Sequence, residues 1–89
     1  MARMELSVVE HAEMAAQTGA PDALFELGLK YSTGREVQAD LVTAHKWFNL
    51  AALRGNDAAL DYRKELAREM SEYDIAEAQR LAREWLNKH

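Results

Sequence analysis

The apolar residues of this chain recur at intervals of three and four, which is the spacing of one face of an α-helix. The clearest stripes lie toward the C-terminus and run through Ala59, Tyr62, Leu66 and Met70, and then through Ile75, Ala78, Ala82 and Trp85. No segment has the pattern of a β-strand. The chain is therefore expected to be all-α.

Capping residues predict where the first helices begin and end. Ser7 and Glu10 have the spacing of a capping box, so a first helix should begin near Val8. Gly19 suits its end, because glycine accepts the left-handed conformation found there. Pro21 suits the first turn of a second helix, where its missing N–H costs nothing.

Similar signals delimit three further helices. Gly34 should end the second helix, and Asp40, after a short loop, offers an N-cap carboxylate for a third helix that ends at Gly55. Asn56 can cap a fourth helix, and Ser71 a fifth. Five helices joined by very short turns predict an antiparallel helical stack.

Two stretches of the chain, Glu13 to Leu24 and Phe48 to Leu60, are near-copies of each other. Their matching residues lie 36 positions apart: Ala15 with Ala51, Ala16 with Ala52, Gly19 with Gly55, Ala23 with Ala59, and Leu24 with Leu60. A period of this size is typical of solenoids built from helix pairs, in which one pair cannot bury its apolar face alone. The repeat predicts stacked helix pairs, with Gly19 and Gly55 in equivalent surroundings.

The residues between the two copies extend the pattern. In order, they are Ala23, Leu24, Leu27, Gly28, Tyr31, Gly34, Val37, Asp40, Ala44, Trp47, Ala51, Ala52 and Gly55. This series resembles the Sel-one-like repeat, a helix-pair family related to tetratricopeptide repeats. The resemblance implies a right-handed alpha-alpha superhelix of five antiparallel helices. It also implies a binding or scaffold module and not an enzyme.

The resemblance divides the single domain, 1–89, into three parts. Residues 7–19 correspond to the second helix of a unit, 20–55 to a full repeat, and 56–89 to a charged C-terminal capping pair. One departure is Glu36, which stands where the family often has a second glycine. Because of that departure, the sequence does not predict the conformation of the turn in this loop.

Composition narrows the possible ligands. The 89 residues are 48% hydrophobic and carry a formal net charge of −4, so no basic surplus favours nucleic acid as a partner. No uncharged apolar run is long enough to span a membrane, and no membrane partner is expected. The absence of cysteine excludes disulfides and fits a cytoplasmic location.

The second helix carries the candidate partner-binding surface. In tetratricopeptide-like pairs the first helix of each unit lines the concave side, which the resemblance carries over to Asp22, Phe25, Glu26, Leu29 and Ser32. Phe25 and Leu29, four residues apart, could anchor a partner peptide or helix. The alternative is that both pack in the core against the fourth helix.

A second hypothesis concerns self-association. The first helix resembles half of a unit whose other helix is missing, so its outer face, including Val8, Ala12 and Ala15, is expected to lack a cover. The chain would then be a structural homodimer in which this helix meets its symmetry mate.

The remaining candidates are assigned to structure. Trp47 and Phe48 are adjacent and cannot share a helix face, so one should pack within its helix pair and the other between pairs. His11, His45 and His89 do not have the spacing of metal ligands, and no catalytic triad pattern is present. We therefore expect no metal, no cofactor and no catalytic residue.

Overall fold

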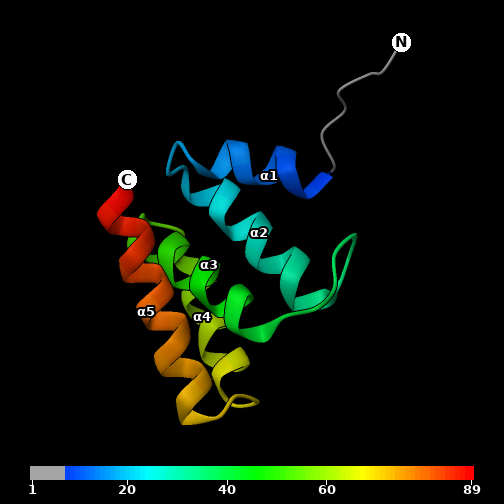
Figure 1. Ribbon diagram of the computed structural model, residues 1–89, viewed down its shortest axis with the longest axis vertical. Helices are drawn as coiled ribbons and strands as arrows, with labels where there is room; N and C mark the ends of the chain where they lie inside the picture. The colour runs from blue at the N-terminus through cyan, green and yellow to red at the C-terminus, as the bar shows by residue number, and fades with distance from the viewer. Residues whose placement is uncertain (1–7) are drawn as a thin grey trace.

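The computed structural model describes residues 8–89, with side chains from Glu10 onward. Five helices lie in this part of the chain and no strand does: α1 (Val8–Ala16), α2 (Pro21–Thr33), α3 (Leu41–Leu53), α4 (Asp57–Ala67) and α5 (Glu72–Lys88). Successive helices reverse direction through short turns (Figure 1). The expectation of an all-α protein of five helices is confirmed. Ser7, and with it the proposed capping box, lies outside the described residues.

The predicted caps of the later helices are confirmed. The side chain of Asp40 accepts a hydrogen bond from the Thr43 backbone N–H at 3.2 Å. Asn56 accepts from Ala59 N–H at 3.0 Å in the same way. At the start of α5, Ser71 accepts from the Asp74 N–H at 3.1 Å. Each of these side chains satisfies a backbone donor that the first turn of a helix leaves unpaired.

Helix α3 lies at the centre of the fold and packs against α2, α4 and α5 (Figure 1). Several sides of this helix are buried, and its residues Phe48 and Leu50 are among the largest fully buried side chains. Helix α1 packs on α2 at one end of the stack. The core is therefore one continuous cluster that runs from Ala16 in α1 to Trp85 in α5.

Helices α2 and α3 approach closely at Gly28. A Cβ atom placed on Gly28 would lie 2.4 Å from the Phe48 ring, so only glycine leaves room for that ring. Phe48 thus packs within the α2–α3 pair, whereas Trp47 meets Trp85 of α5 at 6.3 Å between ring centroids. This division of the two adjacent aromatic residues is the one predicted.

The two copies of the repeat are not packed alike. Gly19 and Gly55 both have positive φ angles, 77° and 111°. Gly19, however, is buried beneath the Arg54 side chain, while Gly55 is exposed with open space around it. Leu24 is fully buried, but its counterpart Leu60 is 36% exposed. The expectation of equivalent surroundings is wrong, because Arg54 at the end of α3 covers the first turn and no described residue covers the second.

The α2–α3 loop contains the one departure noted from the repeat pattern. Glu36 has a φ of 68°, the left-handed conformation that glycine adopts without cost. Its side chain forms an ion pair with Lys30 at 2.8 Å. The loop is also tied to α2 by the Asp40 N–H, which donates to the Tyr31 carbonyl oxygen at 2.9 Å. The backbone therefore keeps a glycine-like turn although the residue is glutamate.

Candidate functional site

The five residues predicted to bind a partner all lie on α2, and the structure brings them to one side of it. Asp22 and Glu26 are exposed, while Phe25, Leu29 and Ser32 are half-buried. The hydroxyl of Ser32 donates to the Leu29 carbonyl oxygen at 3.2 Å, which is a bond within the helix. Ser32 thus adds little to the outer surface of α2. The accessible part of that surface is formed by Asp22, Phe25, Glu26 and Leu29.

Phe25 connects α2 to both α3 and α4. Its ring centroid lies 5.7 Å from that of Phe48 and 5.2 Å from that of Tyr62, and the Tyr62 contact is edge-on. The Phe48 and Tyr62 centroids are 5.4 Å apart. Such pairs stabilise a contact beyond their buried area. Phe25 therefore has both of the roles considered from sequence: it packs against the fourth helix, and it remains partly accessible.

Tyr62 is the residue of this surface that the sequence analysis did not identify. It was predicted as part of the buried stripe of α4, but it is 47% exposed while its ring contacts Phe25 and Phe48. Phe25, Leu29 and Tyr62 are hereafter called the apolar strip. The strip spans two helices far apart in sequence, so no pattern within one helix could have revealed it.

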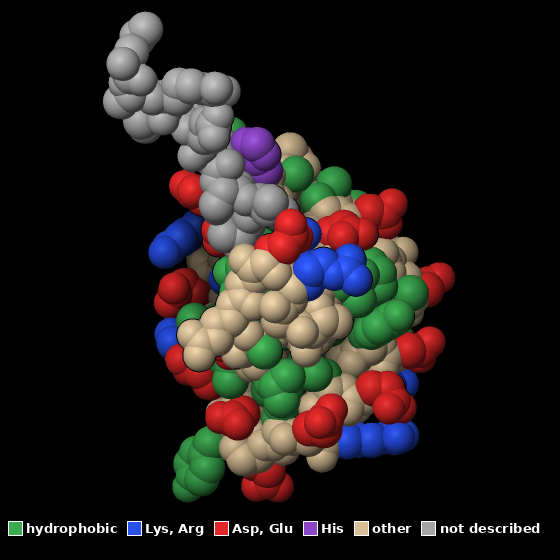
Figure 2. All heavy atoms as spheres, turned by 90° about the vertical axis from the view of Figure 1, so that its right-hand side faces the viewer, with side chains coloured by type: hydrophobic (Ala, Val, Ile, Leu, Met, Phe, Trp, Pro, Cys, Tyr) green, Lys and Arg blue, Asp and Glu red, His purple; other side chains and the backbone are tan. Residues whose placement is uncertain are grey.

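Acidic side chains border the apolar strip. Asp22 and Glu26 lie near Phe25 on α2, Glu65 lies one turn after Tyr62 on α4, and Glu69 lies in the turn that follows α4. All four are exposed. Figure 2, viewed from the side of the α2–α3 loop, shows exposed apolar side chains with acidic side chains and some basic ones around them.

A shallow depression of about 160 Å³ adjoins the strip. Its lining is formed by residues of α2 and the following loop, namely Glu26, Leu29, Lys30, Thr33 and Arg35. Sites for small molecules usually have about 300–1,000 Å³ and a mainly apolar lining. The depression is smaller and more polar than that, so it extends a surface and does not enclose a ligand.

A second cluster, on the other side of α3, combines aromatic rings with cations. The Nζ atom of Lys46 lies 4.1 Å from the centre of the Trp47 ring, and the guanidinium of Arg54 lies 5.6 Å from that of Trp85. The ring of His89 stacks on Trp85 with centroids 4.0 Å apart. Burial lowers the pKa of Lys46, although Glu13 and Glu84 oppose that shift. Of these contacts, the one between Arg54 and Trp85 joins α5 to the end of α3.

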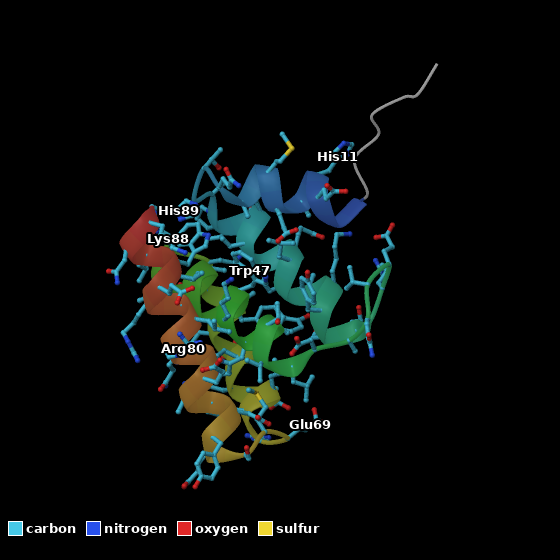
Figure 3. The ribbon with its side chains drawn as sticks, viewed as in Figure 1. His11, Trp47, Glu69, Arg80, Lys88 and His89 are labelled. Carbon is cyan, nitrogen blue, oxygen red and sulfur yellow. The ribbon has the colours of Figure 1, made fainter. Side chains whose placement is uncertain are left out.

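The three histidines have different surroundings. His11 is exposed on α1, His45 is buried in α3, and His89 follows α5 (Figure 3). Within residues 8–89, no three histidine or carboxylate side chains are arranged to hold a metal ion. None of the helices described there has the length and hydropathy to cross a membrane.

The residues expected to mediate self-association are placed as follows. The side chain of Val8 lies outside the described residues. Ala12 is half-buried and packs against the core cluster. Ala15 is exposed, and near it on α1 Met14 is 58% exposed.

No protein-family model matches this sequence, and no curated protein matches it either. The similarity to the Sel-one-like repeat accordingly rests on the residue pattern alone.

Proposed function

We propose that this chain is a non-enzymatic binding module of the Sel-one-like class, which acts as a small adapter in the cytoplasm and binds a partner protein. The observation that carries the proposal is the apolar strip: Tyr62 leaves nearly half its surface in solvent although its ring already packs on Phe25. Partly exposed aromatic residues held by rigid neighbours are typical anchors of protein interfaces.

The right-handed superhelical arrangement belongs to the same proposal. Support comes from the 36-residue recurrence and from the central position of α3, which contacts the helices before and after it. In such an array α2 and α4 would be the first helices of successive units, and the Phe25–Tyr62 contact joins these two helices.

A matched pair of tyrosine variants tests the proposal. Tyr62→Ala removes the accessible anchor, whereas Tyr73→Ala removes a tyrosine that is 90% exposed on α5 and lies outside the strip. A photo-crosslinking amino acid at position 26 should capture a partner protein in the native host, and one at position 79 on α5 should not. We expect Tyr62→Ala to weaken binding of that partner by about tenfold or more, the effect of an interface anchor.

Folding must be separated from binding in this experiment. Circular dichroism and thermal melting show whether Tyr62→Ala keeps its helices. Equal affinity of the folded Tyr62→Ala and Tyr73→Ala variants, or crosslinks only at position 79, would contradict a site on the strip.

A further inference from the structure

We infer that the partner of the apolar strip is a cationic amphipathic helix, with lysine or arginine side chains on both sides of an apolar face. This inference rests on the proposed function and adds the chemistry of the occupant. It follows from three features of the surface: the shape of the apolar strip, the charge of its border, and the positions of the nearby cations.

The first feature is the geometry of the strip. Phe25 and Leu29 are four residues apart on α2 and so lie one turn above the other, while Tyr62 of α4 meets the Phe25 ring edge-on. Apolar side chains presented by two neighbouring helices suit a third helix, which presents apolar residues at intervals of three and four.

The second feature is the charge of the border. Exposed carboxylates lie on both helices of the strip and beyond it, with Asp22 and Glu26 on α2, Glu65 on α4 and Glu69 in the turn after α4. Asp22 accepts a hydrogen bond from the Asn56 amide at 3.2 Å, and Glu65 pairs with the exposed Arg68 at 3.1 Å. Glu26 and Glu69 form no ion pair with any residue between 8 and 89. These two carboxylates are available to a partner's cations.

The third feature is that two of the nearby cations, Lys30 and Arg63, are turned to other partners. Lys30 is paired with Glu36 at 2.8 Å. The Arg63 guanidinium donates to Asn49 of α3 at 2.7 Å and therefore points inward from α4. Arg35 is exposed and lines the depression together with Leu29, so the acidic border is confined to the part of the strip around Phe25 and Tyr62. The strip thus presents an apolar centre with a negative border, and a basic amphipathic helix has the complementary distribution.

A second copy of this chain fits the strip poorly. A symmetric dimer would bring the same face of two molecules together and would set their carboxylates against each other. The formal net charge of −4 adds to that repulsion. The charge distribution consequently favours a basic partner over self-association through this face.

Model peptides test this inference directly. The first probe is a peptide of lysine and leucine, about 14 residues or four helical turns long, with leucine on one face. The second has glutamate in place of each lysine, and the third has the composition of the first with leucine spread around the helix. Binding is measured by fluorescence anisotropy, and the contact surface is mapped by amide chemical shifts. We expect only the first peptide to bind, with shifts in α2 and α4.

Charge variants provide the matched control. Glu26→Gln with Glu69→Gln should weaken binding of the first peptide about three- to tenfold, the effect of two exposed ion pairs. Glu72→Gln with Glu77→Gln changes the net charge equally on α5 and should leave the affinity unchanged. Raising salt from about 50 to about 300 mM should weaken binding to the unmodified protein, because exposed charges are screened.

The other outcomes are equally informative. Equal binding of the glutamate peptide in α2 and α4 would overturn the cationic partner and leave the proposed binding surface in place. Equal binding of the third peptide would overturn the amphipathic requirement. Shifts confined to other helices would contradict both the inference and the proposed site. If the first peptide does not bind at about 1 mM, near −4 kcal/mol, the inference is rejected, while the crosslinking experiment still judges the proposed function separately.

Discussion

His45 is the one buried side chain of the described structure that can carry a charge near neutral pH. It is 3% exposed, and its Nδ1 atom has no hydrogen-bond partner in residues 8–89. Burial lowers the pKa of His45, and the positive charge of Arg63 lowers it further. A neutral imidazole tolerates this position, whereas an imidazolium would be left without a counter-ion.

This burial predicts a pH-dependent stability. The unfolded chain takes up a proton at His45 as the pH falls below about 6.5, but the folded chain resists protonation until a lower pH. The free energy of unfolding should therefore be highest above about pH 6.5 and should fall as the pH is lowered through that value. His45→Met, which cannot titrate and has a similar volume, should lose less stability between pH 7.5 and about pH 5.5.

Chemical unfolding of both proteins at the two pH values measures the difference. All other side chains are the same in both proteins, so only the difference between the variants reports on His45. Parallel stability profiles would show that His45 does not contribute.

At the scale of single residues, the sequence predicted some positions and not others. It separated Trp47 from Phe48 correctly, because adjacent residues on a helix point about 100° apart whatever surrounds them. It did not place Tyr62 at the surface or His45 in the interior. An amphipathic side chain such as tyrosine or histidine fits either environment, so its burial depends on which helix lies opposite.

The closest approach between elements is the crossing of α2 and α3 at Gly28. The Phe48 ring lies where a side chain at position 28 would begin, and Phe48 is fully buried. The ring therefore has little freedom to move aside. The helical context would normally favour alanine over glycine, so tertiary packing overrides local preference here.

Gly28→Ala tests this contact. Alanine should stabilise the isolated helix by about 1 kcal/mol relative to glycine. Overpacking against Phe48 should cost about 1–3 kcal/mol, and a leucine at this position should cost more. We expect the packing cost to offset or exceed the helical gain, measured as the free energy of unfolding in urea. The control, Ala58→Gly on the exposed face of α4, should be destabilised by about 1 kcal/mol from helix propensity alone. Stabilisation of Gly28→Ala by the full helical gain would disprove the close crossing.

The loop between α2 and α3 shows how one element can keep its shape with an unfavourable residue. Glu36 adopts the left-handed conformation, which costs a residue with a side chain about 1–2 kcal/mol. The ion pair with Lys30, whose side chain is only 15% exposed, offsets part of that cost. The sequence identified position 36 as unusual, because glutamate stands where the repeat family often has glycine. The ion pair with Lys30 could not be predicted, because it depends on how the loop folds back over α2.

For the whole molecule, the distribution of exposed apolar side chains decides which surface is available for association. The apolar strip joins two helices and is bordered by carboxylates. Among the side chains described from Glu10 onward, the exposed apolar residues of α1 are Met14 and Ala15, and Ala12 packs against the core cluster. That is little apolar surface for a stable dimer, which needs about 800 Å² on each partner.

We therefore expect the free protein to be a monomer with the chain mass of 10.1 kDa. Light scattering across a range of concentrations measures this mass. A dimer that is lost in Met14→Lys would instead support self-association through α1, the second hypothesis drawn from the sequence. The Glu69→Gln variant serves as the control, because that residue lies in the turn after α4, away from α1 (Figure 3).

The sequence by itself determined the helices and their ends, because apolar spacing and capping hydrogen bonds act within a few residues of the chain. Only the tertiary structure decided that Gly19 is covered and Gly55 open, and that Phe25, Leu29 and Tyr62 form one strip. Both properties depend on which helices stack on each other. Stacking brings together residues that lie too far apart in the sequence for any local pattern to relate them.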